Sequence, residues 1–173
     1  LQREEGKDEK TIIIDHNDSS AIPVQDSGSP KEKEALSILV VEDNADMRGY
    51  IRSILREQYH VLEAANGEEA LHILNSNPID FIINDLMMPV MDGIELSRKV
   101  KETFTISHIP FLMLTAKTSQ EARLESYRMG VDEYLLKPFD ETLLLTRIQN
   151  ILENRKRYQR KFTLDMDVDV LNM

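Results

Sequence analysis

Short apolar runs alternate with helical patterns from Ser37 to Leu152, and this alternation constrains the fold more than any other feature of the sequence. The runs are rich in β-branched side chains, so they predict buried strands. They cover residues 38–41, 59–64, 79–84, 110–115 and 133–137. Each is followed by a stretch with apolar residues on one helical face. Strands that alternate with helices predict an α/β domain, in which a parallel sheet carries helices on both faces.

Polar residues mark where the predicted helices start and end. Asn44 and Asp140 are residue types that cap helix N-termini, and they precede the first and the fifth helix. Thr118 and Glu121 form a capping box for the fourth helix, which Gly130 would end. These positions agree with the helix limits that the apolar spacing predicts.

The two ends of the chain differ in composition from the middle. Residues 1–34 are polar and charged and contain too few apolar residues to offset the entropy of ordering, so we predict a flexible linker. Residues 35–154 are predicted to form one domain, since 173 residues suffice for one core with appendages. Residues 155–173 are predicted to be a basic helical extension and a tail toward a C-terminal effector. Because the chain begins with Leu1 and stops at Met173 without a closing element, we expect it to be part of a longer protein.

The fifth helical pattern does not stop cleanly at Leu152. Arg155, Tyr158 and Phe162 continue its spacing within a cluster of basic residues. Such a cluster suits the C-terminal end of a helix dipole, and it is compatible with a solvated face or with a signalling helix that joins the domain to an effector. Acidic and apolar residues alternate over 165–170, which indicates a half-buried or disordered tail.

The composition excludes several classes of function. The formal net charge of -10 argues against nonspecific binding of nucleic acid and favours divalent cations or basic partners. The absence of cysteine excludes a disulfide framework and cysteine-ligated zinc. No apolar stretch is long enough to span a bilayer, and the N-terminus lacks a secretory pattern, so we expect a soluble, cytoplasmic fragment without membrane contact.

Polar and charged residues follow the predicted strands at their carboxyl ends, where open parallel sheets bind ligands. These residues are Glu42, Asp43, Asp85, Thr115 and Lys137. Three carboxylates close together repel one another unless a cation is present, and oxygen ligands without nearby cysteine or histidine favour Mg²⁺. Alone, Asp85 is compatible with a helix cap, a metal ligand or a nucleophile. An aspartate beside a metal, a lysine and a hydroxyl is arranged to attack phosphorus, which predicts an aspartyl phosphate.

The segment from Ser37 to Leu152 resembles a response-regulator receiver domain of bacterial two-component signalling. The resemblance rests on Glu42-Asp43, on Asp85 in the stretch D-L-M-M-P-V-M-D-G, on Thr115-Ala116, on Tyr134 and on Lys137-Pro138. It implies a flavodoxin-like, doubly wound sheet of five parallel strands in the order 2-1-3-4-5, with five helices.

The resemblance also implies a role for each site residue. Asp85 would be the phosphoacceptor, and Lys137 and Thr115 would contact the phosphoryl group. Mg²⁺ would be held by Asp43, by Asp85 and by the backbone carbonyl of Met87, with Glu42 acting mainly through water. Tyr134 would turn inward once Thr115 is drawn to the phosphoryl group.

Two other residues of the phosphoacceptor stretch invite an interpretation. Asp92 with Gly93 opens the third helix, so we interpret Asp92 as structural. Met87 follows Asp85 by two residues, and its apolar side chain is expected to influence the access of hydrolytic water.

Partners follow from the same resemblance. The phosphodonor would be the phosphohistidine of a histidine kinase, in cis or in trans, and the domain would also catalyse its own slow dephosphorylation. The long linker before the domain and the basic helix after it resemble hybrid sensor proteins of Bacteroidetes type, in which a histidine kinase precedes the receiver and an AraC-like DNA-binding domain follows. Such a parent can be membrane-anchored, and its output would be transcription.

Alternatives stay open at this point. A receiver can serve in dimerisation without being phosphorylated, and pairing of two copies is compatible with the sequence. A haloacid-dehalogenase-like phosphatase also uses a strand-end aspartate and Mg²⁺, but it needs a second aspartate where this chain has Met87. Glu42 and Asp43 could merely charge the first turn of a helix, and Tyr134 could simply fill the edge of the sheet.

Overall fold

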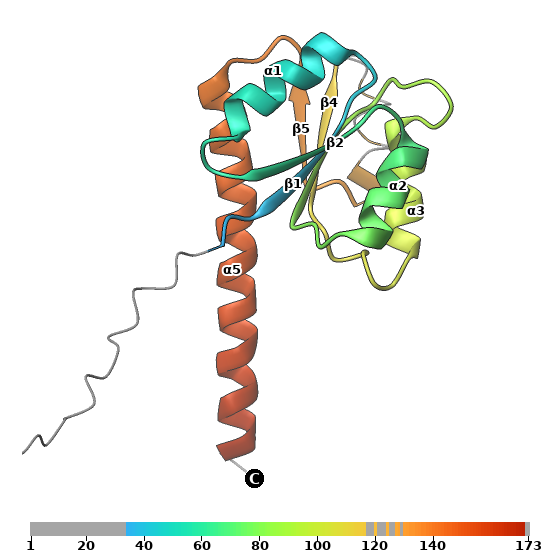
Figure 1. Ribbon diagram of the computed structural model, residues 1–173. Helices are drawn as coiled ribbons and strands as arrows, with labels where there is room; N and C mark the ends of the chain where they lie inside the picture. The colour runs from blue at the N-terminus through green and yellow to red at the C-terminus, as the bar shows by residue number, and fades with distance from the viewer. Residues whose placement is uncertain (1–33, 117–119, 121–123, 125–126, 129, 172–173) are drawn as a thin grey trace, which may run out of the picture. The chain divides into compact units, whose positions relative to one another are not determined.

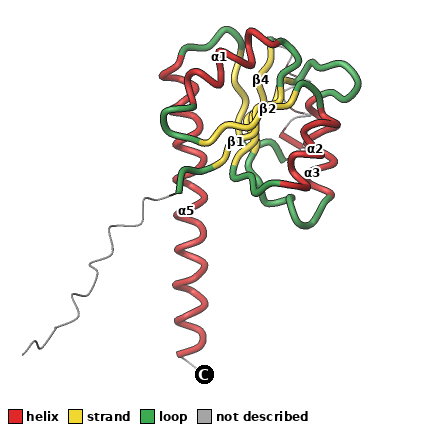
Figure 2. Tube along the Cα trace, in the orientation of Figure 1, coloured by secondary structure: helices red, strands yellow, loops and turns green. Residues whose placement is uncertain are grey.

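Five parallel strands form one sheet in the order β2-β1-β3-β4-β5 (Figures 1 and 2). The computed structural model describes residues 34–116, 120, 124, 127–128 and 130–171. The strands are β1 (Ser37–Val41), β2 (His60–Ala64), β3 (Phe81–Asp85), β4 (Phe111–Thr115) and β5 (Glu133–Leu136). The predicted strand order and flavodoxin-like class are confirmed, and the predicted strand bounds differ by at most two residues.

Helices cover both faces of the sheet. Those with bounds in the described part of the chain are α1 (Ala45–Leu55), α2 (Gly67–Ser76), α3 (Gly93–Glu102) and α5 (Glu141–Leu171). Helices α1 and α5 lie on one face, and α2 and α3 lie on the other (Figure 1). The predicted fourth helix, with Thr118 and Glu121, falls mostly outside the described residues. Gly130, expected at its end, has a φ of 82°, the left-handed conformation of a glycine that ends a helix.

Two hydrophobic cores lie on opposite faces of the shared sheet, because side chains alternate along each strand. Leu39, Val41 and Ile82 pack toward α2 and α3. Their neighbours Ile38 and Val40 pack toward α1 and α5. All residues of β3 and β4 are buried, as the near-continuous apolar runs predict.

In the part of the chain that the structure describes, four polar side chains cap helices, and each accepts a hydrogen bond from the backbone N–H three residues further on. They are Asn44 (2.9 Å), Asn66 (2.9 Å), Asp92 (2.8 Å) and Asp140 (2.7 Å). The structural interpretation of Asp92 is therefore confirmed. The caps fix where each helix leaves the strand before it, and so they shape the loops at the carboxyl edge of the sheet.

Helix α5 is longer than predicted. It runs to Leu171, so the interpretation of 165–170 as a disordered tail is wrong, because the backbone is helical there. Half-burial of these residues stays a prediction. The alternating pattern needs a partner strand to become a strand, and neither glycine nor proline interrupts the chain after Pro138. Among the described residues, no helix is both long and apolar enough to cross a membrane.

Candidate functional site

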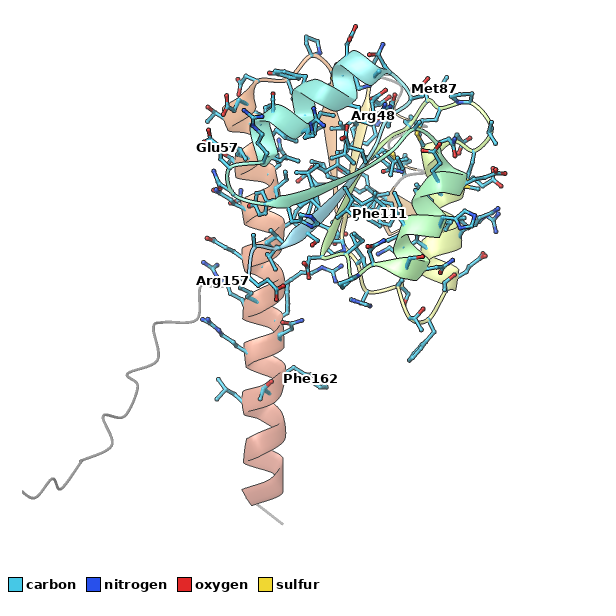
Figure 3. All side chains as sticks on the ribbon, viewed as in Figure 1. Arg48, Glu57, Met87, Phe111, Arg157 and Phe162 are labelled. Atoms are coloured by element: carbon cyan, nitrogen blue, oxygen red, sulfur yellow. The ribbon has the colours of Figure 1, made fainter. Side chains whose placement is uncertain are left out.

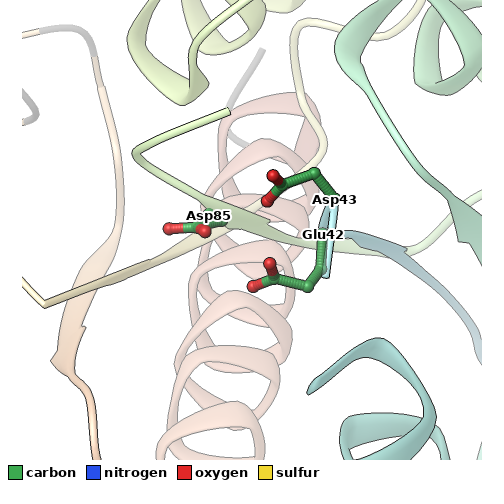
Figure 4. Close-up of side chains that lie close together, drawn as sticks. All are labelled: Glu42, Asp43 and Asp85. Atoms are coloured by element: carbon green, nitrogen blue, oxygen red, sulfur yellow. The ribbon is translucent and has the colours of Figure 1, made fainter. Parts of the chain in front are cut away.

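Three carboxylates meet where β1 and β3 end side by side. Val41, the last residue of β1, pairs with Asn84, so Glu42 and Asp43 follow β1 next to Asp85. One oxygen from each of the three side chains lies within 4.8 Å of the others, and the side chains converge from two neighbouring strands (Figure 4). The sequence predicted this meeting from the strand ends alone.

Lys137 joins this cluster from the end of β5. Its Nζ lies 2.7 Å from Oε2 of Glu42 and 3.1 Å from Oδ2 of Asp85. The backbone N–H of Lys137 donates to the carbonyl of Thr115 at 2.8 Å, which ties the ends of β4 and β5 together. One ammonium group therefore bridges carboxylates from β1 and β3.

Burial and charge pairing act against each other in this cluster. Only 1% of Glu42 and 6% of Asp85 is exposed. Burial raises the pKa of the Glu42 carboxyl, and the hydrogen bonds from Lys137 and from the Asn44 N–H offset only part of that rise. Burial also lowers the pKa of the Lys137 amine, but the hydrogen bond to Glu42 and the charge of Asp85 outweigh it and raise the pKa overall. Lys137 is therefore held in its charged form.

Two hydrogen bonds hold Glu42, one at its side chain and one at its backbone carbonyl. The Asn44 N–H donates to Oε1 of Glu42 at 3.1 Å, and Arg48 donates from Nη1 to the Glu42 carbonyl at 2.7 Å. Arg48, labelled in Figure 3, also places its Nε 3.5 Å from Oε1 of Glu63 on β2. Sequence reasoning did not find Arg48. Its position in the first turn of α1, six residues after Glu42, is the sequence feature that could have indicated a contact with the end of β1.

The loop that carries the phosphoacceptor candidate is closed at its base. The Gly93 N–H donates to the Leu86 carbonyl at 3.0 Å, and the Asn84 amide donates to the Gly93 carbonyl at 3.1 Å. A Cβ on Gly93 would lie 2.4 Å from the Asp85 carbonyl oxygen, so this close approach requires glycine. Asn84 was also missed as a site residue. Its Oδ1 is buried without a hydrogen-bond partner in the described structure.

Met87, labelled in Figure 3, follows Asp85 by two residues in the loop after β3. Its side chain is 54% exposed, and its N–H donates to Oδ1 of Asp85 at 3.3 Å. The exposed Pro89 and Val90 follow in the same loop. An influence of the Met87 side chain on the access of water to Asp85 stays a prediction.

Thr115 and Tyr134 lie on adjacent strands and are both buried. Tyr134 belongs to the core beneath α2 and α3 and is 6% exposed, so the structure holds it in the inward position. Both residues make interactions within the protein. A movement of Tyr134 that follows Thr115 stays a prediction.

The donor set fits a hard divalent cation. Glu42, Asp43 and Asp85 bring three negative charges together, while Lys137 supplies the one ion-paired amine that the described residues show at the cluster. The remaining negative charge suits Mg²⁺, which prefers carboxylate oxygens and keeps several waters. Both Glu42 oxygens already accept hydrogen bonds within the protein, which agrees with an indirect role for that residue.

Comparison with known sequences shows which proteins this chain is similar to. The family model described as the response regulator receiver domain matches residues 38–149. The chain is 42% identical over 146 residues to Histidine kinase P4 of Formosa agariphila, covering 82% of this chain and 11% of that protein. It is 37% identical over 120 residues to the chemotaxis protein CheY of Pseudomonas aeruginosa, covering 68% of this chain and 97% of that one. The chain thus spans only a small part of the sensor kinase that it matches.

Solved structures show the same fold. The chemotaxis protein CheY4 of Vibrio cholerae superimposes with a TM-score of 0.65 at 35% identity, covering 67% of this chain and 98% of that one. The receiver domain of a histidine kinase from Syntrophus aciditrophicus gives a TM-score of 0.66 at 32% identity, with coverage of 71% and 94%. In each case the uncovered part of this chain is larger than that of the other protein.

Proposed function

The chain belongs to the family of response regulator receiver domains, and on that premise we propose that Asp85 accepts a phosphoryl group from the phosphohistidine of a histidine kinase. The observation that carries this proposal is the bridge from Lys137 to Glu42 and Asp85 beside a third carboxylate. A lysine in that place neutralises part of the charge that would otherwise repel an incoming phosphoryl group.

The transfer exchanges one bond for another. An oxygen of Asp85 forms a bond to phosphorus while the P–N bond to the donor imidazole breaks, and the imidazole nitrogen keeps the electron pair. Asp85 is 6% exposed at the edge of the sheet, so the donor approaches from the loop side. The product of this step is an aspartyl phosphate at Asp85.

Each neighbouring side chain has a part in this proposal. Lys137 contacts the transferred phosphoryl group, and the Thr115 hydroxyl donates a hydrogen bond to it. Asp43, Asp85 and the Met87 carbonyl would hold Mg²⁺, with Glu42 acting through water. Bound there, the ion would shield the negative charge of the phosphoryl oxygens.

The phosphorylated form would then act on a downstream element. The added charge draws Thr115 toward the phosphoryl group, and Tyr134 responds on the neighbouring strand. A coupling of this kind is typically about 1–3 kcal/mol, enough to shift populations of an existing fold. Water that attacks the same phosphorus breaks its bond to the Asp85 oxygen, so that inorganic phosphate leaves and Asp85 returns to its free carboxylate.

The similarity to Histidine kinase P4 of Formosa agariphila supports a hybrid parent, in which a histidine kinase lies in the same polypeptide as this domain. In that setting the phosphodonor acts in cis, and the domain works on the cytoplasmic side of a parent that is itself membrane-anchored. An AraC-like DNA-binding domain would follow α5 and carry the output to transcription.

The experiment that tests the proposal uses a small phosphodonor. Incubation of the chain with acetyl phosphate and Mg²⁺ should add the mass of one phosphoryl group, and EDTA should suppress the addition. Asp85→Asn should show no adduct. Asp92→Asn is the matched control, since Asp92 lies in the same loop but caps α3, and asparagine also caps helices. An adduct that persists in Asp85→Asn would overturn the proposal.

A further inference from the structure

Asn84 is a fully buried polar side chain one residue before Asp85. It pairs across the sheet with Val41 on β1 and with Met113 on β4. Both neighbours belong to the core under α2 and α3 (Figure 1). Because side chains alternate along a strand, Asn84 faces that core while Asp85 faces the opposite side of the sheet. A polar side chain among apolar neighbours is costly to bury, so it calls for a specific role.

The side-chain amide of Asn84 is only half satisfied. Its nitrogen donates to the Gly93 carbonyl at 3.1 Å, whereas its buried Oδ1 accepts no hydrogen bond from the residues that the structure describes. A buried acceptor without a donor destabilises the folded state, because water hydrogen-bonds to it in the unfolded chain. An apolar side chain would avoid this cost and would suit a strand better than asparagine does. The stability of the core therefore does not account for asparagine at this position.

The helix itself does not need the hydrogen bond from Asn84. Gly93 is the first residue of α3, and the carbonyl of a first helical residue accepts a hydrogen bond from within the helix. Asn84 thus adds a second donor to that oxygen. Its Nδ2 also lies 3.0 Å from the position that a Cβ on Gly93 would take, so the amide packs directly against the start of α3. The second bond therefore fixes the place at which the helix begins.

A series of backbone hydrogen bonds leads from Gly93 to the site. The Gly93 N–H donates to the Leu86 carbonyl at 3.0 Å, and the Leu86 N–H donates to the Leu114 carbonyl at 2.8 Å. Leu86 is thus held through both of its backbone groups. Met87 comes next in the chain, and its N–H donates to Oδ1 of Asp85 at 3.3 Å. The start of α3 therefore sets where the backbone of Met87 lies relative to the Asp85 carboxylate.

We propose that Asn84 is a positioning residue for the phosphorylation of Asp85. By holding Gly93, it fixes the loop that presents the Met87 carbonyl to the divalent cation. The role of Asn84 rests on the proposed function, in which Asp43, Asp85 and Met87 hold that cation. Removing a hydrogen bond that orients a metal ligand typically weakens metal affinity about 10–100-fold. The cost of the buried Oδ1 is retained because the nitrogen of the same amide serves the site.

Asn84→Leu separates a positioning role from a structural one. Leucine has the branching of asparagine but offers neither a donor nor an acceptor. The urea concentration at the midpoint of unfolding should therefore stay the same or rise. The dissociation constant for Mg²⁺, measured by isothermal titration calorimetry, should rise at least about tenfold. Asn84→Val should give the same result with a smaller side chain, which avoids overfilling the core.

Ser97→Ala is the matched control. Ser97 is also fully buried in α3, and its Oγ donates at 2.8 Å to the carbonyl of Ile94, the residue after Gly93. Its loss should leave the affinity for Mg²⁺ unchanged, because this hydrogen bond stays within the helix. An equal loss of affinity in Ser97→Ala would overturn the proposal, since any loosening of α3 would then suffice. A lower unfolding midpoint together with weaker binding in both Asn84 variants would also overturn it, because Asn84 would then support the fold as a whole.

The carbonyl of Met87 can be observed directly. Met87-Met88 is the only pair of adjacent methionines in the sequence, so methionine labelled with ¹³C at the carbonyl and ¹⁵N at the amide gives one correlated signal, from the peptide bond between them. Mg²⁺ should shift this signal in the wild type, and Asn84→Leu should need about tenfold more Mg²⁺ for the same shift. Identical titration curves in the two proteins would contradict the positioning role.

A failure of the proposed function is recognised separately. If the wild type gains no phosphoryl group from acetyl phosphate and Mg²⁺, Asp85 is not a phosphoacceptor and the proposed function is wrong. Binding of Mg²⁺ requires no phosphoryl transfer, so the two titrations still decide whether Asn84 positions the cation site. A normal adduct in the wild type, with unchanged Mg²⁺ affinity in both Asn84 variants, would overturn the role of Asn84 alone.

Discussion

One lysine serves two buried carboxylates at the site, and this imbalance has a chemical consequence. Lys137 pairs with Glu42 and Asp85, while the exposed Asp43 adds a third negative charge. If positive side chains fully balanced the negative charge around Asp85, a bound cation would stabilise the site little. Under the proposed function, the residual charge would attract a cation and would leave Asp85 available as a nucleophile once the cation is bound.

Met87 offers a test of how solvent reaches the phosphorylated aspartate. Met87→Asn should shorten the lifetime of the phosphorylated form by roughly tenfold, equivalent to about 1.4 kcal/mol in the barrier. The reason is that an exposed thioether next to Asp85 excludes water, whereas an amide hydrogen-bonds to it. The decay of the phosphorylated mass after removal of the phosphodonor measures this lifetime.

Val90→Asn supplies the control for Met87→Asn. Val90 is exposed in the same loop, and its φ of 70° is one that asparagine adopts more readily than valine. The lifetime should be unchanged in this variant. If both variants shorten it equally, the polarity of the whole loop matters rather than the position of Met87.

Lys101 provides a pH-dependent prediction away from the site. Its ammonium group donates to the carbonyls of Ser107 and Ile109, both at 3.3 Å, and lies 5.7 Å from the centre of the Phe111 ring. Burial lowers its pKa from the ordinary 10.5, more than the charge of Asp132 raises it. The folded state therefore releases this proton at lower pH than the unfolded state does.

The sign of the effect follows from proton linkage. Between the lowered pKa and 10.5, the unfolded chain binds more protons at Lys101, so its contribution to the free energy of unfolding rises with pH. Lys101→Met should lose that rise. Urea unfolding of both proteins at neutral pH and near pH 10 measures it, and an equal change with pH in the two proteins would contradict the assignment.

Strand-end residues could be predicted from the sequence, whereas supporting residues could not. Asp85 and Lys137 each follow an apolar run, and parallel strands bring such ends to one edge whatever the details of packing. Arg48 and Asn84 act through contacts that depend on the register between strands and on the angle at which α1 and α3 leave them. Neither quantity is encoded in local residue patterns.

At the scale of elements, the connection from β3 to α3 determines the site. Gly93 begins α3 directly against the backbone of Asp85, and its N–H returns to Leu86. The loop between them is therefore closed at its base, with Met87 at its exposed side. The position of Asp85, the proposed phosphoacceptor, depends on how closely α3 can approach the end of β3.

Two glycines make a matched pair that tests this dependence. Gly93→Ala should destabilise the protein by about 1–3 kcal/mol, because the new Cβ would lie 2.4 Å from the Asp85 carbonyl oxygen. Gly49→Ala, within α1, should stabilise by about 0.5–1 kcal/mol, since no atom lies within 4 Å of its Cβ position. Chemical denaturation measures both changes. Phosphorylation should slow in Gly93→Ala alone, and an equal slowing in both variants would show that the approach of α3 to β3 is not the cause.

The sequence pattern predicts where α5 begins but not where it ends. Its start could be predicted from the Asp140 cap and from apolar residues that repeat on one face. Its end could not, because the residues from Lys156 to Leu164 are exposed and the residues over 165–170 carry a pattern of period two. The helix persists there because an established helix adds residues at little cost when no breaking residue intervenes.

At the scale of the whole molecule, a single sheet separates two cores. One core lies under α2 and α3 and contains Leu96, and the other lies under α1 and α5 and contains Leu144. Both cores use the same strands, whose side chains alternate between them. Loss of packing on either face therefore removes support for the strands that the other face needs, and the site lies at the edge where both meet.

Truncating one leucine on each face tests this shared dependence. Leu96→Ala and Leu144→Ala should each lower the free energy of unfolding by about 2–5 kcal/mol, because both side chains are fully buried and a cavity remains. Hydrogen exchange followed by mass spectrometry should show that either substitution lowers protection of β1, β3 and β4 by a similar factor. A shared sheet gives this result, since its backbone hydrogen bonds cannot open for one core alone. If each substitution lowers protection only in the helices on its own face, the two cores are independent, and a signal from Asp85 would then need a route through one face rather than through the sheet.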